Sequence, residues 1–158
     1  MAARFDYAQA EEIKVAFARH GVRYLFIGKS GAVLLGYPDT TQDADLFVLK
    51  SEENGRRCAA AVRDLGFDIS DQTAAEILRG KDFVQLKNGP FDLDLVFAPD
   101  GIESFEAAWR NRVETEGFPV AHPDDIINSK EAARRAKDLE SLPRLRAFRD
   151  YWKAQRKL

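Results

Sequence analysis

The chain has 158 residues, of which 45% are hydrophobic and 32% charged, with a formal net charge of -2. This length fits one domain with a single core, and the composition excludes a disordered chain and a polycation that coats nucleic acid. A single cysteine, Cys58, excludes an internal disulfide, and no apolar run approaches the ~18 residues of a membrane span. We therefore expect a cytoplasmic protein without a membrane partner.

The first half of the chain alternates between helical and strand patterns. Apolar residues at helical spacing predict helices, and short apolar runs rich in β-branched and aromatic residues predict strands. In chain order these are a helix over 8–20 ended by Gly21, a strand over 22–27, a short helix over 30–35 ended by Gly36, a strand over 44–49, and a helix up to residue 65 with Ser51 as its N-cap.

The second half continues with a helix over 71–79 and two strands, 82–87 and 91–97, that flank an Asn-Gly-Pro turn and predict a hairpin. A helix over 103–112 and a short ribbon over 114–120 follow. Pro123 opens a helix that runs through residue 136, and Ser141 and Pro143 predict a break before a last helix. The sequence thus predicts an α+β chain in which helices flank a small mixed β-sheet. A core over 1–122 and a helical C-terminal part over 123–158 pack as one compact domain.

Two pairs of aspartates stand on two of these strands. Residues two apart face the same side of a strand, so Asp43 projects with Asp45, and Asp92 with Asp94. Such pairs are often the solvent face of an edge strand. Here a strand, a flexible turn and a short helix precede the first pair, and like charges side by side are unfavourable unless a cation compensates them. This pattern indicates a phosphate cradle that faces a magnesium site.

These residues resemble the signature of the nucleotidyltransferase superfamily: a Gly-[Gly/Ser] turn, a spacer, Asp-x-Asp, and a third carboxylate on a later strand. More narrowly, IGKSGAVLLGYPDTTQDADLFV and HPDDIINSKEAARRAKDLESL are similar to blocks of the AbiEii/AbiGii-type toxin nucleotidyltransferases and related bacterial proteins. The resemblance covers roughly residues 21–145. It implies the nucleotidyltransferase fold and the transfer of a nucleoside monophosphate from a nucleoside triphosphate to a hydroxyl of RNA or protein.

The resemblance also implies a set of site residues. Asp43, Asp45 and Asp94 would be catalytic and hold Mg²⁺ or Mn²⁺; the distance in sequence to Asp100-Gly101 favours Asp94, with Asp92 as the alternative. The triphosphate or the acceptor would be bound by Gly28, Lys29, Ser30, Thr41, Lys130, Arg134 and Lys137. The last three recur at i, i+4 and i+7, which predicts one helix face; we expect Lys130 to contact the triphosphate, and Arg134 and Lys137 to guide the acceptor or pair with acids such as Asp138. The other reading of this face is an ordinary solvated side.

Two residues depart from the family pattern. Lys29 stands where the family has a small residue, and Asp39 stands where relatives often carry arginine. The lysine either grips a phosphate as a point charge or fills the cradle. Three functions remain open: a toxin-like enzyme acting on RNA or protein with an antitoxin as partner, a catalytically silent fold that binds a nucleotide or protein, and a modifier of small molecules such as antibiotics.

Overall fold

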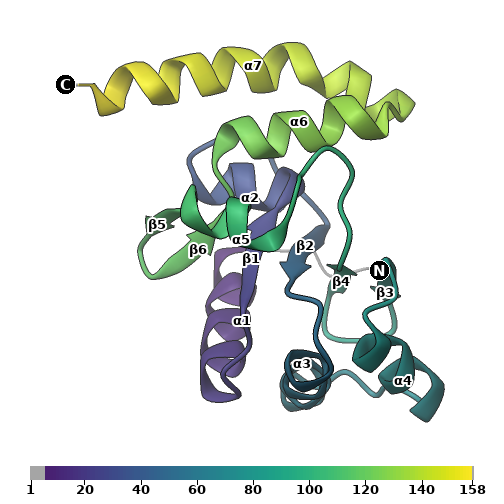
Figure 1. Cartoon of the computed structure of the whole chain (residues 1–158). Coiled ribbons are helices and arrows are strands. Elements are labelled where there is room, and N and C mark those ends of the chain that lie inside the picture. The colour runs from purple at the N-terminus through teal and green to yellow at the C-terminus, as the bar shows by residue number, and fades with distance from the viewer. Residues whose placement is uncertain (1–5, 158) are drawn as a thin grey trace.

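The computed structural model describes residues 6–157, which fold into helices around one mixed sheet (Figure 1). The described elements are α1 (Tyr7–Arg19), β1 (Tyr24–Ile27), α2 (Gly28–Leu34), β2 (Asp43–Val48), α3 (Glu52–Asp64), α4 (Asp71–Arg79), β3 (Phe83–Leu86), β4 (Asp92–Val96), α5 (Phe105–Arg110), β5 (Val113–Thr115), β6 (Phe118–Val120), α6 (Pro123–Ala133) and α7 (Ala136–Arg156). None of the helices in this part of the chain is long and apolar enough to cross a membrane.

The sheet has the strand order β3-β4-β2-β1-β6-β5. The β2–β4 and β1–β6 pairs are parallel, while β1–β2, β3–β4 and β5–β6 are antiparallel. The expected α+β class with a mixed sheet is therefore confirmed, and so are the hairpin around Asn88-Gly89-Pro90 and the short ribbon, which is β5–β6. The parallel β2–β4 pair makes two strands that are far apart in sequence direct neighbours at the centre of the sheet.

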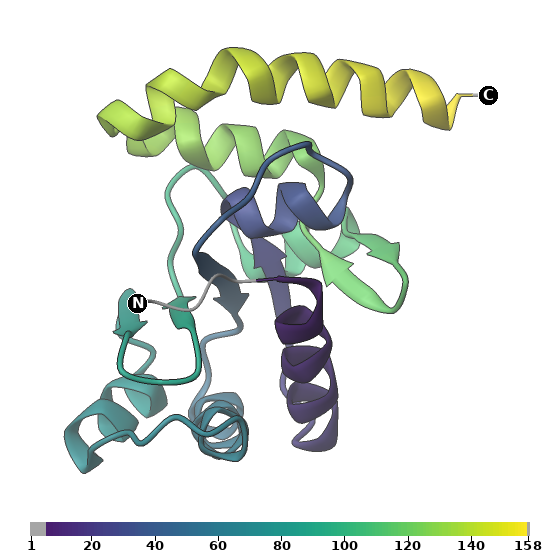
Figure 2. The same cartoon turned by 180° about the vertical axis from the view of Figure 1, so that it is seen from behind.

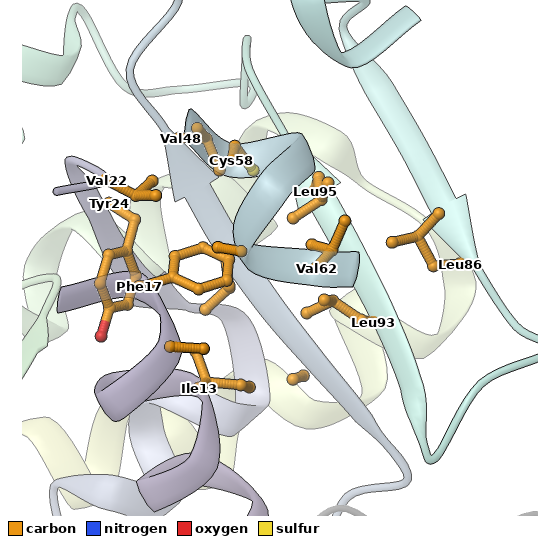
Figure 3. Packing of buried hydrophobic residues seen from close by; sticks show 14 of the residues in the cluster. Ile13, Phe17, Val22, Tyr24, Val48, Cys58, Val62, Leu86, Leu93 and Leu95 are labelled. Atoms are coloured by element: carbon orange, nitrogen blue, oxygen red, sulfur yellow. The ribbon is translucent and has the colours of Figure 1, made fainter. Parts of the chain in front are cut away.

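One face of the sheet packs against α1 and α3. Ile13 and Phe17 in α1, and Cys58 and Val62 in α3, each lie four residues apart and are fully buried, so each helix presents one apolar stripe to the strands. Figure 3 shows these side chains converging with Leu93 and other strand residues in the largest core cluster. Burial of such side chains contributes about 1.5 to 3 kcal/mol each.

The other face of the sheet is covered only in part. Leu25 and Ile27 of β1 and Phe47 of β2 pack under α5 and α6, through Phe105 and Ile126. The C-terminal helices α6 and α7 lie side by side along this side of the molecule, as both views show (Figure 1, Figure 2). No helix of this cluster reaches β3, so the sheet face at β3 and part of β4 borders an open cleft.

The C-terminal helices break at a different place from the one the sequence indicated. The helix that starts at Pro123 ends at Ala133, because Arg134 adopts a left-handed conformation with φ of 54°. The next helix runs without interruption from Ala136 through Pro143 to Arg156. The expected break at Ser141 and Pro143 is wrong: buried Leu142 and Leu145 pack against a cluster from α2 and α6, and this packing outweighs the loss of one helical hydrogen bond at proline.

Smaller differences concern helix ends. Residue Gly28 is the first residue of α2 rather than part of a turn before it, so the expected start at Ser30 is two residues late. The helix expected over 103–112 is shorter, because the Ser104 side chain accepts a hydrogen bond from the Ala107 N–H and starts α5 at Phe105. Ser51 caps α3 as expected, by accepting from the Asn54 N–H at 3.0 Å.

Candidate functional site

Two carboxylates meet on adjacent central strands. The parallel register aligns Asp45 of β2 with Asp94 of β4, and Asp43 with Asp92, so the four side chains share one face of the sheet. Asp94 is 7% exposed. Its Oδ1 is buried and accepts no hydrogen bond from residues 6–157 while both carboxyls are ionised. Unpaired buried acceptors are uncommon and costly, which marks this atom as a place for a cation or a proton.

The protonation of the pair follows from this arrangement. Burial raises the pKa of Asp45, and the negative charge of Asp94 raises it further. Burial also raises the pKa of Asp94. Each negative charge disfavours the ionisation of its neighbour, so the arrangement favours a proton shared by the pair or a cation bound to it.

A glycine allows the helix start to approach Asp45. Gly28 has φ of 61°, and a Cβ at this position would collide with the Asp45 carboxylate, lying 3.1 Å from its Cγ. Ser30 then fixes the strand behind that carboxylate: its Oγ donates to the Ile27 carbonyl and accepts from the Asp45 N–H, each at 3.0 Å. The Ser30 hydroxyl is therefore fully buried and already bonded, so it orders the site from behind instead of facing a ligand.

Lys29 is paired with Asp39, so the two departures from the family pattern contact each other. Lys29 Nζ lies 3.0 Å from Asp39 Oδ2, and Arg144 Nη1 lies 3.8 Å from the same oxygen. The hydrogen bond from Lys29 lowers the pKa of Asp39, which keeps the pair charged. Thr41 lies nearby, and its Oγ1 donates to the Asp43 carbonyl at 3.2 Å in the turn that leads into β2.

Cations from the C-terminal helices face the acid pair. The fully buried Asp138 anchors them, with Arg135 Nε 2.7 Å from its Oδ2 and Lys130 Nζ 3.4 Å from its Oδ1. Burial by itself would raise the pKa of Asp138, but the hydrogen bond from Arg135 and the charge of Lys130 outweigh it and lower the pKa. The charges of Lys130 and Lys137 also act on the acid pair. They oppose the rise that burial causes in the pKa of Asp45 and in the pKa of Asp94, respectively, but do not cancel it.

These groups line one cleft of about 640 Å³ between the open sheet face and the C-terminal helices, a size typical of ligand sites. Of the residues predicted from the sequence, those in its lining are Gly28, Lys29, Thr41, Asp43, Asp45, Asp94, Lys130 and Lys137. Ser30, Asp92 and Arg134 are not in the lining. Arg134 does not share a helix face with the two lysines, because it lies after the end of α6 and Lys137 lies in α7.

The sequence analysis did not assign Arg135 and Phe83 to the site, and it named Asp138 only as a partner for Arg134 or Lys137, whereas Asp138 pairs with Arg135 and Lys130. Arg135, Asp138 and Phe83 all line the cleft. The helix break at Arg134 brings Arg135 and Asp138 to the cleft. No glycine or proline at this position predicted the break from the sequence. Phe83 could have been found from the period of two along its strand, which places it on the same face as Gln85, the residue opposite Asp94 in the hairpin register.

A divalent cation fits the chemistry of the carboxylates: a buried oxygen without a donor, two acids in register, and hard oxygen ligands. In the described part of the chain, no group of three or more His, Cys, Asp or Glu side chains is placed to hold an ion. In comparisons with known proteins, no family model and no curated protein matches the chain.

Proposed function

We propose that the protein is a metal-dependent nucleotidyltransferase that moves a nucleoside monophosphate from a nucleoside triphosphate to a hydroxyl acceptor. The observation that carries this proposal is the in-register pair Asp45 and Asp94, with the buried Asp94 Oδ1 lacking a donor among the described residues, faced across one cleft by the cations that Asp138 anchors. Carboxylates opposite cations suit a ligand that brings both a metal and phosphates.

The cleft has two walls: the sheet wall, which carries Asp43, Asp45 and Asp94, and the helical wall, which carries Lys130, Arg135, Lys137 and Asp138. Each wall would have a part in the reaction. Asp45 and Asp94, with Asp43 beside them, would hold Mg²⁺ or Mn²⁺, which when bound neutralises phosphate charge and makes the acceptor hydroxyl more acidic. Lys130 and Lys137 lie where they can bind the phosphates. The acceptor oxygen forms a bond to the α-phosphorus, the bond from that phosphorus to the bridging oxygen breaks, pyrophosphate leaves with the electron pair, and the hydroxyl proton passes to water.

The charge distribution favours RNA over protein as the acceptor. Residues 1–122 contain 14 basic and 20 acidic side chains, whereas residues 123–158 contain 10 basic and 6 acidic ones. The C-terminal segment thus carries an excess of positive charge, including Lys130, Arg135 and Lys137 in the cleft lining, and such an excess attracts a polyanion. An RNA-modifying activity agrees with the toxin-like nucleotidyltransferases that the sequence resembles, for which an antitoxin would be the partner; a small-molecule acceptor has no such support.

The direct test measures pyrophosphate release with Mg²⁺ and each nucleoside triphosphate, in the presence of cellular RNA or protein. With an α-phosphate-labelled nucleotide, we expect label in the RNA fraction. Asp45→Asn should abolish the transfer, while Arg134→Ala, which changes a cation outside the cleft, should retain nucleotide turnover. Absence of both pyrophosphate and label with every triphosphate would contradict the enzymatic function.

One observation favours a second candidate, a silent fold that binds a nucleotide. Two of the cleft lysines are already paired with carboxylates within the protein, Lys29 with Asp39 and Lys130 with Asp138, which Arg135 also contacts. A triphosphate would have to compete with these carboxylates for the lysines. Calorimetric binding of a nucleotide without pyrophosphate release would identify this candidate.

A further inference from the structure

An apolar row crosses the sheet next to the acid pair. The strand registers align Phe83 of β3 with Val96 of β4, and Val96 with Phe47 of β2. These three residues lie on the same sheet face as Asp94 and Asp45, two positions further along the strands, which corresponds to ~7 Å. The face that carries the carboxylates therefore continues directly into an apolar strip.

The strip is covered at one end and open at the other. Phe47 is buried beneath Phe105 of α5, with ring centroids 5.1 Å apart, and Val96 packs beside this cluster. Phe83, at the other end, is 45% exposed and lines the cleft together with Val96 and Pro99. Phe83 thus faces the charged cleft, whereas its neighbours Val84 and Leu86 lie on the opposite face of β3 and are buried in the core.

We propose that Phe83 is the platform on which the base of the bound nucleotide stacks. This inference rests on the proposed function and names the part of the substrate that the second end of the cleft recognises. A nucleotide has an anionic end and a flat apolar end, separated by a ribose. The cleft offers carboxylates and cations at Asp45 and Lys130 and an apolar strip that ends at Phe83, with Asp82 and Asp100 also in the lining.

The chemistry of a ring face predicts how the nucleotide is selected. Stacking on an aromatic side chain uses the π-face that every base has, so it gives affinity with little discrimination between bases. We therefore expect the protein to accept several nucleoside triphosphates with similar affinities. Inorganic tripolyphosphate, which has the same charged groups and no base, should bind more weakly than ATP by the contribution of the stack.

The experiment compares ATP and inorganic tripolyphosphate, each with Mg²⁺, by isothermal titration calorimetry. For Phe83→Ala we expect the Kd of ATP to rise by about 5-fold to 150-fold, the range measured for loss of one base–aromatic stack, and the Kd of tripolyphosphate to stay unchanged. Phe83→Trp should retain ATP affinity, and its indole fluorescence should be quenched by ATP. Tyr151→Ala is the matched control, since Tyr151 is an exposed aromatic residue, 64% exposed, outside the cleft lining.

The outcomes separate this inference from the proposed function. If ATP and tripolyphosphate both bind the wild-type protein and Phe83→Ala leaves both affinities unchanged, the stacking platform is wrong and the phosphate site stands. If neither ligand binds the wild-type protein, the nucleotidyltransferase proposal fails first and takes this inference with it. A change in oligomeric state on Phe83→Ala, with ATP affinity unaltered, would assign the exposed ring to an interface between proteins and overturn the stacking role.

Discussion

The two walls of the cleft carry opposite charges and satisfy them in opposite ways. On the sheet, Asp45 and Asp94 repel each other, and Asp94 Oδ1 has no donor among the described residues. On the helices, Lys130 and Arg135 are held by the buried Asp138. The helical wall is therefore held in place by a carboxylate of its own and keeps excess positive charge, whereas the sheet wall holds a carboxylate oxygen without a donor. If the proposed function holds, this difference predicts that a bound metal changes the stability of the sheet wall more than that of the helical wall.

The largest effect on stability should come from the helical wall. Asp138→Asn removes the charge that anchors two cations, and breaking a buried ion pair from one side typically costs about 3 kcal/mol or more. We expect a drop of about 3 kcal/mol in the free energy of unfolding, measured by urea denaturation. Arg134→Ala, one residue before the anchored Arg135, is the control and should change stability by less than about 0.5 kcal/mol. Equal stability of Asp138→Asn and wild type would show that the wall is not built on this carboxylate.

The sheet wall should respond to metal instead. In wild type, Mg²⁺ with a triphosphate should raise the melting temperature. The corresponding gain in the free energy of unfolding is about 2.7 kcal/mol when the ligand concentration is a hundred times its Kd. Asp45→Asn should remove this effect without unfolding the protein. Asp92→Asn is the matched control, because Asp92 lies in register with Asp43 but outside the cleft lining. If neither Mg²⁺ nor the triphosphate changes the wild-type melting temperature, the proposal that Asp45 and Asp94 bind a cation is wrong.

The two walls should also differ in the sign of their pH dependence. The folded-state pKa of Asp45 is raised, so its contribution is present at low pH and is lost as pH rises through that pKa; the pKa of Asp138 is lowered, so its contribution is lost as pH falls. Without metal, we expect wild-type stability to decline from about pH 4, near the pKa of an unfolded aspartate, to about pH 8, the pKa of folded Asp45, and Asp45→Asn to flatten this decline. Denaturation curves across this range measure it, and an unchanged slope in the variant would contradict the shared proton.

A smaller loss, of about 2 kcal/mol in the free energy of unfolding, is expected for alanine at either of two glycines with positive φ. Comparing the two distinguishes the effect of a steric clash from that of backbone strain. Gly28 has a left-handed φ, and the Cβ of Gly28→Ala would collide with the Asp45 carboxylate. Gly36 has a φ of 110°, and the Cβ of Gly36→Ala would lie 4.0 Å from the Phe148 ring, which is ordinary contact. Both substitutions carry a backbone penalty. Only Gly28→Ala should also reduce metal-dependent stabilisation, which calorimetry with and without Mg²⁺ would measure. Equal metal responses would mean that Asp45 does not need this close approach.

The smallest effect concerns Lys29. If Asp39 neutralises it, Lys29→Ala should weaken triphosphate binding by only about 1 kcal/mol, and Asp39→Asn should strengthen binding by releasing the lysine. Titration calorimetry of both variants decides the point. A stronger loss in Asp39→Asn than in Lys29→Ala would show that Asp39 itself binds the ligand.

Much of the sheet wall could be predicted from the sequence. The period of two in the strands places Asp43 with Asp45 and Phe83 with Gln85, and the hairpin turn at Asn88-Gly89-Pro90 joins β3 to β4. Gly28 was named only through the family resemblance, as part of a phosphate-binding turn, and its close approach to Asp45 was not predicted. The sequence did not determine that β4 pairs with β2 in parallel. Parallel strands are not joined by a short turn, so no local sequence pattern predicts their pairing.

The sequence by itself determined the types of the elements and which side chains share a strand face, because backbone periodicity is a local property. Only the tertiary structure decided the helical wall. The left-handed Arg134 ends α6, and the burial of Leu142 and Leu145 keeps α7 helical through Pro143. Both outcomes depend on packing between distant segments, which can exceed the ~3 kcal/mol preference against an internal proline. The same packing brings Asp138 and its two cations opposite Asp45.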